Sequence, residues 1–183
     1  FFPAHPKRLQ ELLAARKERT EESFQAMEKV SGQFASLFNM LSGKPSVQFH
    51  EGVAGLQKVY DDILDVGEDI FIISSPINEG RQEVLPIIRE QIKKQIAQKI
   101  RTRAITPLAD GQTLATPVAE DEKHLIMRKA VPAEKLNIPA QIIIYGDRVA
   151  ITNFKENIIT VQVESVYIAD TFRAIFEYIW GKS

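Results

Sequence analysis

The segment Gln141-Ile-Ile-Ile-Tyr-Gly-Asp-Arg-Val-Ala-Ile-Thr-Asn153 predicts a β-hairpin, and the other elements can be placed around it. Two β-rich runs, residues 142–145 and 148–152, flank Gly146-Asp147, which can take the positive φ angles that a tight turn requires. The three consecutive isoleucines do not alternate with polar residues, so we expect the first strand to be covered on both faces. The hairpin is therefore expected in the core of a sheet and not at its edge.

The same hairpin resembles the second half of the phospholipase D active-site motif, His-x-Lys-x4-Asp. The resemblance rests on an apolar strand, a short acidic turn and a second strand that ends in small polar residues. One register places Pro139, Gln141 and Gly146 at the His, Lys and Asp positions, and a shift by one residue gives Ala140, Ile142 and Asp147. The chemistry needs an imidazole to attack phosphorus and a cation to hold the phosphoryl oxygens, and neither register supplies them. We therefore expect a phospholipase D-like fold that is not an enzyme.

The composition is that of one ordinary globular domain with room for an appended element. The 183 residues are 44% hydrophobic and 26% charged, and 23 basic and 24 acidic residues give a net charge of -1. This balance offers no electrostatic footprint for nucleic acid and weighs against a DNA-binding domain within these residues. The absence of cysteine excludes disulfides and is compatible with a reducing cytoplasm. No apolar run is long enough to span a bilayer, so we expect a cytoplasmic protein with no membrane partner.

A long helix is predicted near the N-terminus, because Pro6 can open it and no proline follows from Lys7 to Leu41. Two series at heptad spacing run along it and predict a dimer interface. Their apolar members are Leu9, Leu13, Met27, Val30, Phe34 and Leu37. The helix would be roughly 50 Å long, so we expect its C-terminal half to dock and its N-terminal half to pair with a second copy. The alternative to this coiled-coil-like homodimer is a single amphipathic helix that folds back on its own domain.

The residues after this helix predict an α/β domain. Ser42-Gly43-Lys44-Pro45 ends the helix, which gives a linker and dimerisation region at residues 1–44 and a second domain at residues 45–183. Strands are predicted at residues 47–49, 69–75, 100–106, 125–131, 142–145, 148–152 and 157–164, and helices at residues 53–66, 82–98 and 166–180. The alternation of strand and helix in the first half is typical of parallel βαβ units. The polar segment 107–122 is long for a connection, and we expect a mobile flap there.

Three segments of the chain resemble the effector domain of TrmB-type transcriptional regulators. They are Pro45-Ser-Val-Gln-Phe-His-Glu-Gly52, the Tyr-Gly-Asp-Arg-Val-Ala-Ile core of the hairpin, and Phe172-Arg-Ala-Ile-Phe-Glu-Tyr-Ile-Trp180. The preceding helix, with Leu9-x2-Leu12-Leu13, resembles the linker to a winged helix-turn-helix domain. The resemblance implies a phospholipase D-like mixed sheet flanked by helices, without the catalytic motif and preceded by a long coiled-coil-like helix.

The same resemblance implies a function as the effector-binding and dimerisation region of a DNA-binding regulator. The chain begins at Phe1-Phe2-Pro3 without a methionine, so we expect the DNA-binding domain to precede it and DNA to be contacted only through that domain. The effector is a sugar in the best-known members of the family. Their sugar sites lie partly in an extra C-terminal region, whereas this chain stops at Ser183, so we expect a small metabolite without assigning it.

A candidate ligand site follows from the expected sheet, because ligands gather at the carboxyl ends of strands in open α/β sheets. The candidate residues are Glu51, Ser74, Ser75, Arg128, Tyr145 and Asp147. The first two strands would bring Glu51 together with Ser74, and later strands would add the others to the same crevice. The alternatives are a buried ion pair between Glu51 and Arg128 and a turn-forming role for Asp147.

Metal and cofactor chemistry find little support in the sequence. His5, His50 and His124 have no second histidine at metal-ligand spacing, so each is interpreted as a surface or structural residue. The run Glu120-Asp121-Glu122 is interpreted as a solvated loop, and no glycine-rich phosphate loop occurs. We expect no cofactor. The alternatives to a ligand-sensing regulator are an inactive protein-interaction scaffold and a divergent phosphodiesterase or nuclease.

Overall fold

The computed structural model describes residues 16–17, 20, 23, 45–75, 82–108 and 118–182. The chain divides into two compact units, residues 1–43 and residues 44–183. In the first unit the four described residues are helical and exposed, and the Thr20 hydroxyl donates a 2.8 Å hydrogen bond to the Arg16 carbonyl. The residues of the predicted dimer interface, Leu9, Leu13, Met27, Val30, Phe34 and Leu37, lie outside the described residues, so the dimer stays a prediction.

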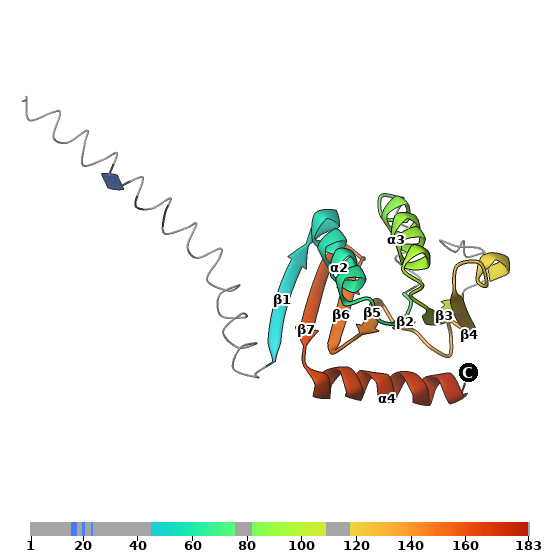
Figure 1. Ribbon diagram of the computed structural model, residues 1–183. Helices are drawn as coiled ribbons and strands as arrows, with labels where there is room; N and C mark the ends of the chain where they lie inside the picture. The colour runs from blue at the N-terminus through green and yellow to red at the C-terminus, as the bar shows by residue number, and fades with distance from the viewer. Residues whose placement is uncertain are drawn as a thin grey trace, which may run out of the picture. The chain divides into compact units, whose positions relative to one another are not determined.

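The second unit contains a seven-stranded mixed sheet. Its strands are β1 (Ser46–Glu51), β2 (Ile70–Ile73), β3 (Thr102–Leu108), β4 (Ile126–Pro132), β5 (Ala140–Tyr145), β6 (Arg148–Asn153) and β7 (Ile159–Glu164). They are arranged in the order β1-β7-β6-β5-β2-β3-β4 (Figure 1). The pairs β2-β3 and β3-β4 are parallel, and the other four pairs are antiparallel.

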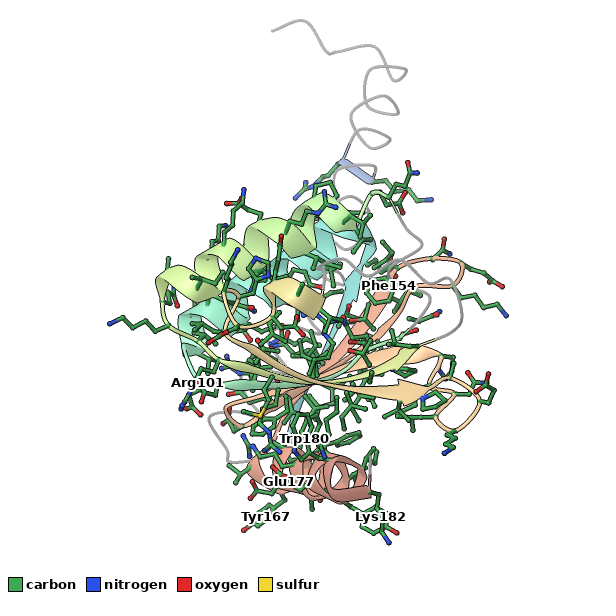
Figure 2. The ribbon with its side chains drawn as sticks, turned by 90° about the vertical axis from the view of Figure 1, so that its right-hand side faces the viewer. Arg101, Phe154, Tyr167, Glu177, Trp180 and Lys182 are labelled. Carbon is green, nitrogen blue, oxygen red and sulfur yellow. The ribbon has the colours of Figure 1, made fainter. Side chains whose placement is uncertain are left out.

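Helices cover both faces of this sheet. Helices α2 (Gly52–Val66) and α3 (Leu85–Ala97) lie on one face, and α4 (Val166–Lys182) lies on the other (Figures 1 and 2). A short 3-10 helix, η2 (Val118–Glu120), precedes β4. Each face has its own buried apolar cluster, one with α2 residues such as Leu56 and Ile63 and one with Phe176 of α4. The mixed sheet with helices on both sides confirms the predicted α/β class.

The β5-β6 hairpin is at the centre of the sheet, as its isoleucines predict. Ile143 and Tyr145 belong to the cluster under α2, whereas Ile144 belongs to the cluster under α4. The turn has Gly146 at φ +48°, and a Cβ atom there would lie 2.9 Å from Val66 Cγ1. Glycine is therefore required at this turn both by the backbone angle and by the close approach of α2.

Helix α4 is fixed to its face of the sheet by Arg103 of β3. The guanidinium carbon lies 4.4 Å from the centre of the Trp180 ring, and both terminal nitrogens donate to the Glu177 carboxylate. Figure 2 labels Glu177 and Trp180 on α4. Beside it, the Phe71 and Phe176 rings meet edge to face at 5.2 Å. The aromatic residues of α4 thus serve as core and as partners for a cation.

The position of β1 differs from the one that the βαβ pattern suggests. The predicted parallel neighbours are found for β2-α3-β3, but β1 pairs with β7 at the edge of the sheet. Strands β7, β6 and β5 lie between β1 and β2. The sheet order depends on a contact between distant segments, because the last strand of the sheet pairs with the first. The local periodicity of the sequence cannot predict such a pairing. Strand β3 also continues through Pro107 to Leu108, which were predicted to belong to the polar flap. Residues 109–117 of that segment lie outside the described residues, so the flap stays a prediction.

We predict that Gly55→Ala destabilises the protein, although alanine normally favours a helix. A Cβ atom at Gly55 would lie 2.8 Å from the carbonyl carbon of His50, and this backbone atom cannot move aside easily. The expected loss in the free energy of unfolding is about 1–3 kcal/mol, measured by urea denaturation. Gly181→Ala in α4 is the control, since no atom lies within 4 Å of its added Cβ. Equal effects of the two substitutions would show that α2 does not approach β1 so closely.

Candidate functional site

A row of polar residues crosses the carboxyl ends of β2 and β3. Ile73 of β2 pairs with Ile142 on one side and Ile105 on the other, so the next residue, Ser74, lies between Gln141 and Thr106. The Ser74 amide continues the ladder by donating a 2.9 Å hydrogen bond to the Ile105 carbonyl. Side chains alternate between the two faces of a strand, so these three polar groups share the face that α3 covers.

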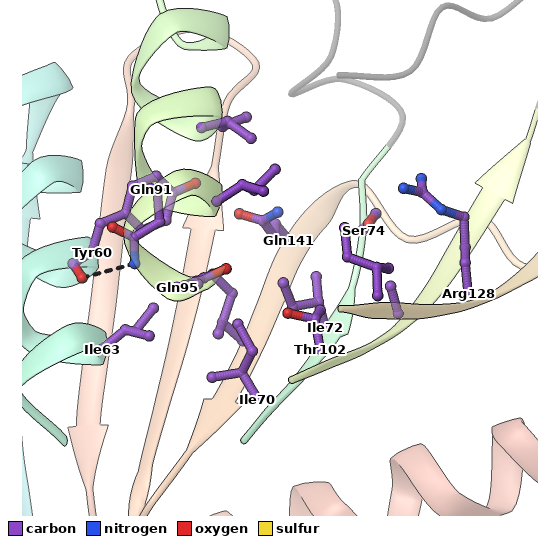
Figure 3. Close-up of a pocket in the computed structure, with 15 residues that line it drawn as sticks. Tyr60, Ile63, Ile70, Ile72, Ser74, Gln91, Gln95, Thr102, Arg128 and Gln141 are labelled. Carbon is purple, nitrogen blue, oxygen red and sulfur yellow. Dashed lines mark hydrogen bonds between the residues drawn. The ribbon is translucent and has the colours of Figure 1, made fainter. Parts of the chain in front are cut away.

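A cavity of about 90 Å³ lies between this face of the sheet and helices α2 and α3 (Figure 3). Its walls are mostly isoleucines from the sheet and from both helices, and its polar lining residues are Tyr60, Ser74, Gln91, Gln95, Thr102, Arg128 and Gln141. Gln91 and Gln95 are one turn apart on α3, and both are buried. The volume suits a small molecule or a few waters.

Two amide oxygens in the cavity wall have no hydrogen-bond partner in the described part of the chain. They are Oε1 of Gln91, which is 4% exposed, and Oε1 of Gln141, which is 5% exposed. The buried hydroxyl of Thr106, in the polar row, also has none. Leaving a buried acceptor unsatisfied costs about 1–3 kcal/mol, and native folds rarely do so without a reason. The polar groups of this cavity are therefore the strongest indication of a binding site.

Arg128 lies at the cavity with its charge compensated. Its Nε and Nη2 atoms donate to the two carboxylate oxygens of Asp121, each at 2.9 Å, and the side chains are only 8% and 12% exposed. The predicted alternative of an ion pair between Glu51 and Arg128 is thus wrong. The interpretation of residues 120–122 as a solvated loop is also wrong for Asp121, because the buried guanidinium requires a counter-charge.

The structure brings together only part of the predicted ligand site. Ser74 and Arg128 line the cavity. Ser75 is fully buried beside it, and its hydroxyl donates a 2.9 Å hydrogen bond to the Pro139 carbonyl, which holds the approach to β5. Glu51 lines a separate hollow at the β1 edge of the sheet, next to Asn157, because three strands separate β1 from β2.

The structure does not bring Tyr145 and Asp147 to this cavity, because they lie at the opposite end of the strands. Tyr145 pairs with Ile70, the first residue of β2, since β5 is antiparallel to β2. Asp147 follows in the hairpin turn, and its carbonyl accepts a 2.8 Å hydrogen bond from the amide of Ser165. Both residues therefore have structural roles far from the Ser74 end of the strands.

At that opposite end of the strands, Asp62 of α2 is the acceptor for three side chains. Tyr145 Oη donates to it at 2.8 Å, Arg148 Nη1 at 2.7 Å and Gln162 Nε2 at 2.7 Å. Burial, and then the Asp62 carboxylate, raise the pKa of the Tyr145 hydroxyl. Burial lowers the pKa of Arg148, but the carboxylates of Asp62 and Glu164 outweigh it and raise the value. This network ties α2 to three strands, and its function is structural.

Sequence reasoning missed Gln91 and Gln95, and it quoted Gln141 without selecting it as a ligand residue. The two α3 glutamines lie on the same helical face as Ile88 and Ile92, which also line the cavity. Polar residues within an apolar stripe of a helix indicate buried polar groups, and this spacing could have identified both glutamines. Gln141 directly precedes the isoleucines of β5. Because side chains alternate between the two faces of a strand, Gln141 lies on the same face as Ile143, and this could have marked it as buried.

No group of three or more histidine, aspartate or glutamate side chains in the described ranges is arranged to hold a metal ion.

Among the same residues, no helix combines the length and the hydropathy that crossing a membrane would require.

Similarity to known proteins is found in structures but not in sequences. A scan against protein-family models and a search of curated proteins each found no match. Among solved structures, the chain is similar to TrmBL2, an archaeal chromatin protein whose structure shows a novel mode of DNA binding. The TM-score is 0.54 at 14% identity, over 98% of this chain and 70% of that chain.

Two further solved structures are similar to three quarters of this chain. NucT from Helicobacter pylori gives a TM-score of 0.53 at 9% identity, over 75% of this chain and 97% of that chain. Nuc from Salmonella typhimurium, a phospholipase D family member, gives 0.52 at 13% identity, over 75% of this chain and 95% of that chain. The chain has a phospholipase D-like fold. This likeness confirms the predicted fold class, while identities this low say nothing more about activity.

The sequence of this phospholipase D-like chain contains no His-x-Lys-x4-Asp motif. At the hairpin, Pro139 occupies the expected His position and Gln141 the expected Lys position in the first register. Gln141 lines the cavity, and the Pro139 carbonyl is engaged by Ser75. A proline ring and a carboxamide cannot replace an imidazole nucleophile and an ammonium group.

We predict that Tyr145→Phe lowers the free energy of unfolding by about 1–2 kcal/mol at pH 7, because Asp62 loses one donor. The raised pKa of Tyr145 means that the folded state keeps a proton which the unfolded chain releases above about pH 10. Stability should therefore fall as pH rises beyond about 10, and less steeply in the variant. Chemical denaturation between pH 7 and 11 measures both effects. Tyr178→Phe, at an exposed position, is the control and should leave both unchanged.

Proposed function

We propose that this chain is the effector-sensing and dimerisation region of a TrmB-like, DNA-associated regulator, and that it does not hydrolyse phosphodiesters. The observation that carries the proposal is the extent of the structural likeness. The similarity to TrmBL2 covers 98% of the chain, whereas the similarities to NucT and Nuc cover 75%. A match to 98% of the chain has to include most of the first unit, residues 1–43, whereas a match to 75% does not.

The chemistry of the cavity supports a sensing role over a catalytic one. The strands that build it are those of the phospholipase D-like sheet, but the hairpin supplies Pro139 and Gln141 where the motif has histidine and lysine. The cavity is lined by apolar walls and a few buried polar groups, which is typical of a small-molecule site. Binding there would favour one of two arrangements of α3 and the sheet, and this preference would be passed to the dimer.

DNA would be contacted through a domain attached to the first unit, not through these residues. The net charge of -1 gives the chain no general attraction for the phosphate backbone. Residues 1–44 would then set the distance between two such domains, so a change in the helix pair would change the DNA spacing that the dimer fits.

A phosphodiesterase is the second candidate, because NucT and Nuc share the fold. We predict that the purified chain does not accelerate the hydrolysis of bis(p-nitrophenyl) phosphate above the buffer rate, with and without added divalent metal ions. Release of p-nitrophenol measured by absorbance tests this. Nuclease activity through an unrecognised site would be established by turnover that co-purifies with the protein and disappears in Gln141→Ala or Ser74→Ala.

We predict that the chain is a homodimer and that Leu13→Glu makes it monomeric. A charge at a heptad position would have to be buried between two helices, and this cost exceeds what the remaining seam contacts can offset. Light scattering coupled to gel filtration at micromolar concentrations gives the mass directly. Lys17→Glu, at an exposed helical position, is the control and should remain dimeric. A monomeric wild-type chain at high concentration would remove dimerisation from the proposal.

A further inference from the structure

We infer that the cavity between α3 and the carboxyl ends of β2 and β3 binds a small, neutral molecule that donates at least two hydrogen bonds. The acceptors are the amide oxygens of Gln91 and Gln141. This inference specifies the ligand of the sensing region and rests on the function proposed above.

The orientation of Gln91 follows from a hydrogen bond of its side-chain amide nitrogen. Its Nε2 atom donates to the Tyr60 carbonyl at 3.0 Å (Figure 3). A carbonyl oxygen accepts and cannot donate, so the amide nitrogen has to face Tyr60 and the amide oxygen has to point elsewhere. That oxygen is buried in the cavity wall without a partner among the described residues. Gln91 is therefore held in a fixed orientation with an acceptor available to a ligand.

Gln141 supplies a second acceptor from a different element. It comes from β5 and Gln91 comes from α3, so the two side chains line the cavity from the sheet and from the helix above it (Figure 3). Both amide oxygens are buried without a partner in the described ranges. Two unpaired amide oxygens on side chains that line one cavity call for an explanation, and a bound donor would provide it.

The charge of the lining excludes an anion and a cation alike. Arg128 is the one charged residue among the described lining residues, and its guanidinium is bound by both oxygens of Asp121. A phosphate group would find no uncompensated positive charge, and an ammonium group would find no carboxylate in the lining. Burying either ion without a counter-charge is far more costly than burying a neutral donor. Hydroxyl and amide N–H groups are the neutral donors that match the two glutamine oxygens.

The lining also favours hydrogen bonding to a neutral group. In the first of the two registers given above, Gln141 takes the lysine position of the motif, and an amide there accepts hydrogen bonds where a cation would hold phosphoryl oxygens. Isoleucines 72, 88 and 143 enclose the amides and keep the local dielectric low, which strengthens a hydrogen bond made there. The cavity volume of about 90 Å³ suits a small ligand.

The test is a heteronuclear NMR titration of the wild-type chain, following the side-chain amide signals of Gln91 and Gln141. The neutral probes are erythritol and acetamide, and inorganic phosphate is the anionic probe. We expect saturable shifts of both amide groups with at least one neutral probe and none with phosphate. Saturable shifts of these groups with phosphate would overturn the inference, and so would the absence of a saturable shift with both neutral probes.

Two substitutions of Gln141 sharpen the test. Gln141→Leu keeps the approximate volume and removes the acceptor, so the neutral probe should bind about tenfold more weakly, as expected for one lost hydrogen bond. Gln141→Lys restores a cation and should introduce phosphate binding that the wild-type chain lacks. Gln98→Leu at the exposed end of α3 is the matched control and should bind the neutral probe as the wild type does. Unchanged probe binding in Gln141→Leu would overturn the assignment, and thermal midpoints of all variants check that they fold.

The titration measures only whether a probe binds in the cavity, whereas light scattering measures whether the chain is a dimer. A negative result in one experiment is therefore distinct from a negative result in the other. Probe binding in a chain that is monomeric would keep the ligand site and remove the dimer mechanism. A dimer without probe binding would keep the regulator and remove this ligand class.

Discussion

The burial of β5 on both faces is the constraint on which the rest of this structure depends. A strand with three consecutive isoleucines exposes a large apolar area unless helices cover it from two sides, and each fully buried isoleucine contributes about 1.5–3 kcal/mol. Helix α2 meets Ile143 from one side, and α4 meets Ile144 from the other. The other strands add on either side of this hairpin, which places the carboxyl ends of β2 and β3 under α3. The cavity lies where the apolar layer gives way to polar residues.

Buried polar groups gather at both ends of the strands, but they are arranged differently. At the hairpin end, Asp62 accepts from Tyr145, Arg148 and Gln162, and this carboxylate ties α2 to three strands. The Nε atom of Arg148 is nevertheless buried there without a hydrogen-bond partner in the described part of the chain. At the Ser74 end, the amide oxygens of Gln91 and Gln141 are unpaired among the described residues, and their side chains line a cavity. The cavity, and not the unpaired groups alone, distinguishes the candidate site from the structural network.

Most of the secondary structure could be predicted because its cause is local. The turn at Gly146, the apolar run of β5 and the stripe of α4 each follow from residues near one another in the sequence. The sheet order could not be predicted this way, since pairing of β1 with β7 is a choice between distant segments. The assignments of Glu51 and Tyr145 to the ligand site failed for that reason. The partner of Arg128 was missed because Asp121 lies in a run of acidic residues, which is typical of a solvated loop. The burial of a single carboxylate leaves no periodic pattern in the sequence that would indicate its pairing with Arg128.

The pairing of β1 with β7 also has a consequence for how the chain folds. Ser46 pairs with Glu164, so the first strand to be synthesised has to wait for the last before its ladder can close. Closing so large a loop is entropically costly and slow, and during synthesis Val47 and Phe49 would present an unpaired apolar strand. Phe49 stays 72% exposed even in the finished sheet. Aggregation of the nascent chain would therefore start at β1, and chaperone capture would be most useful in the interval before β7 emerges.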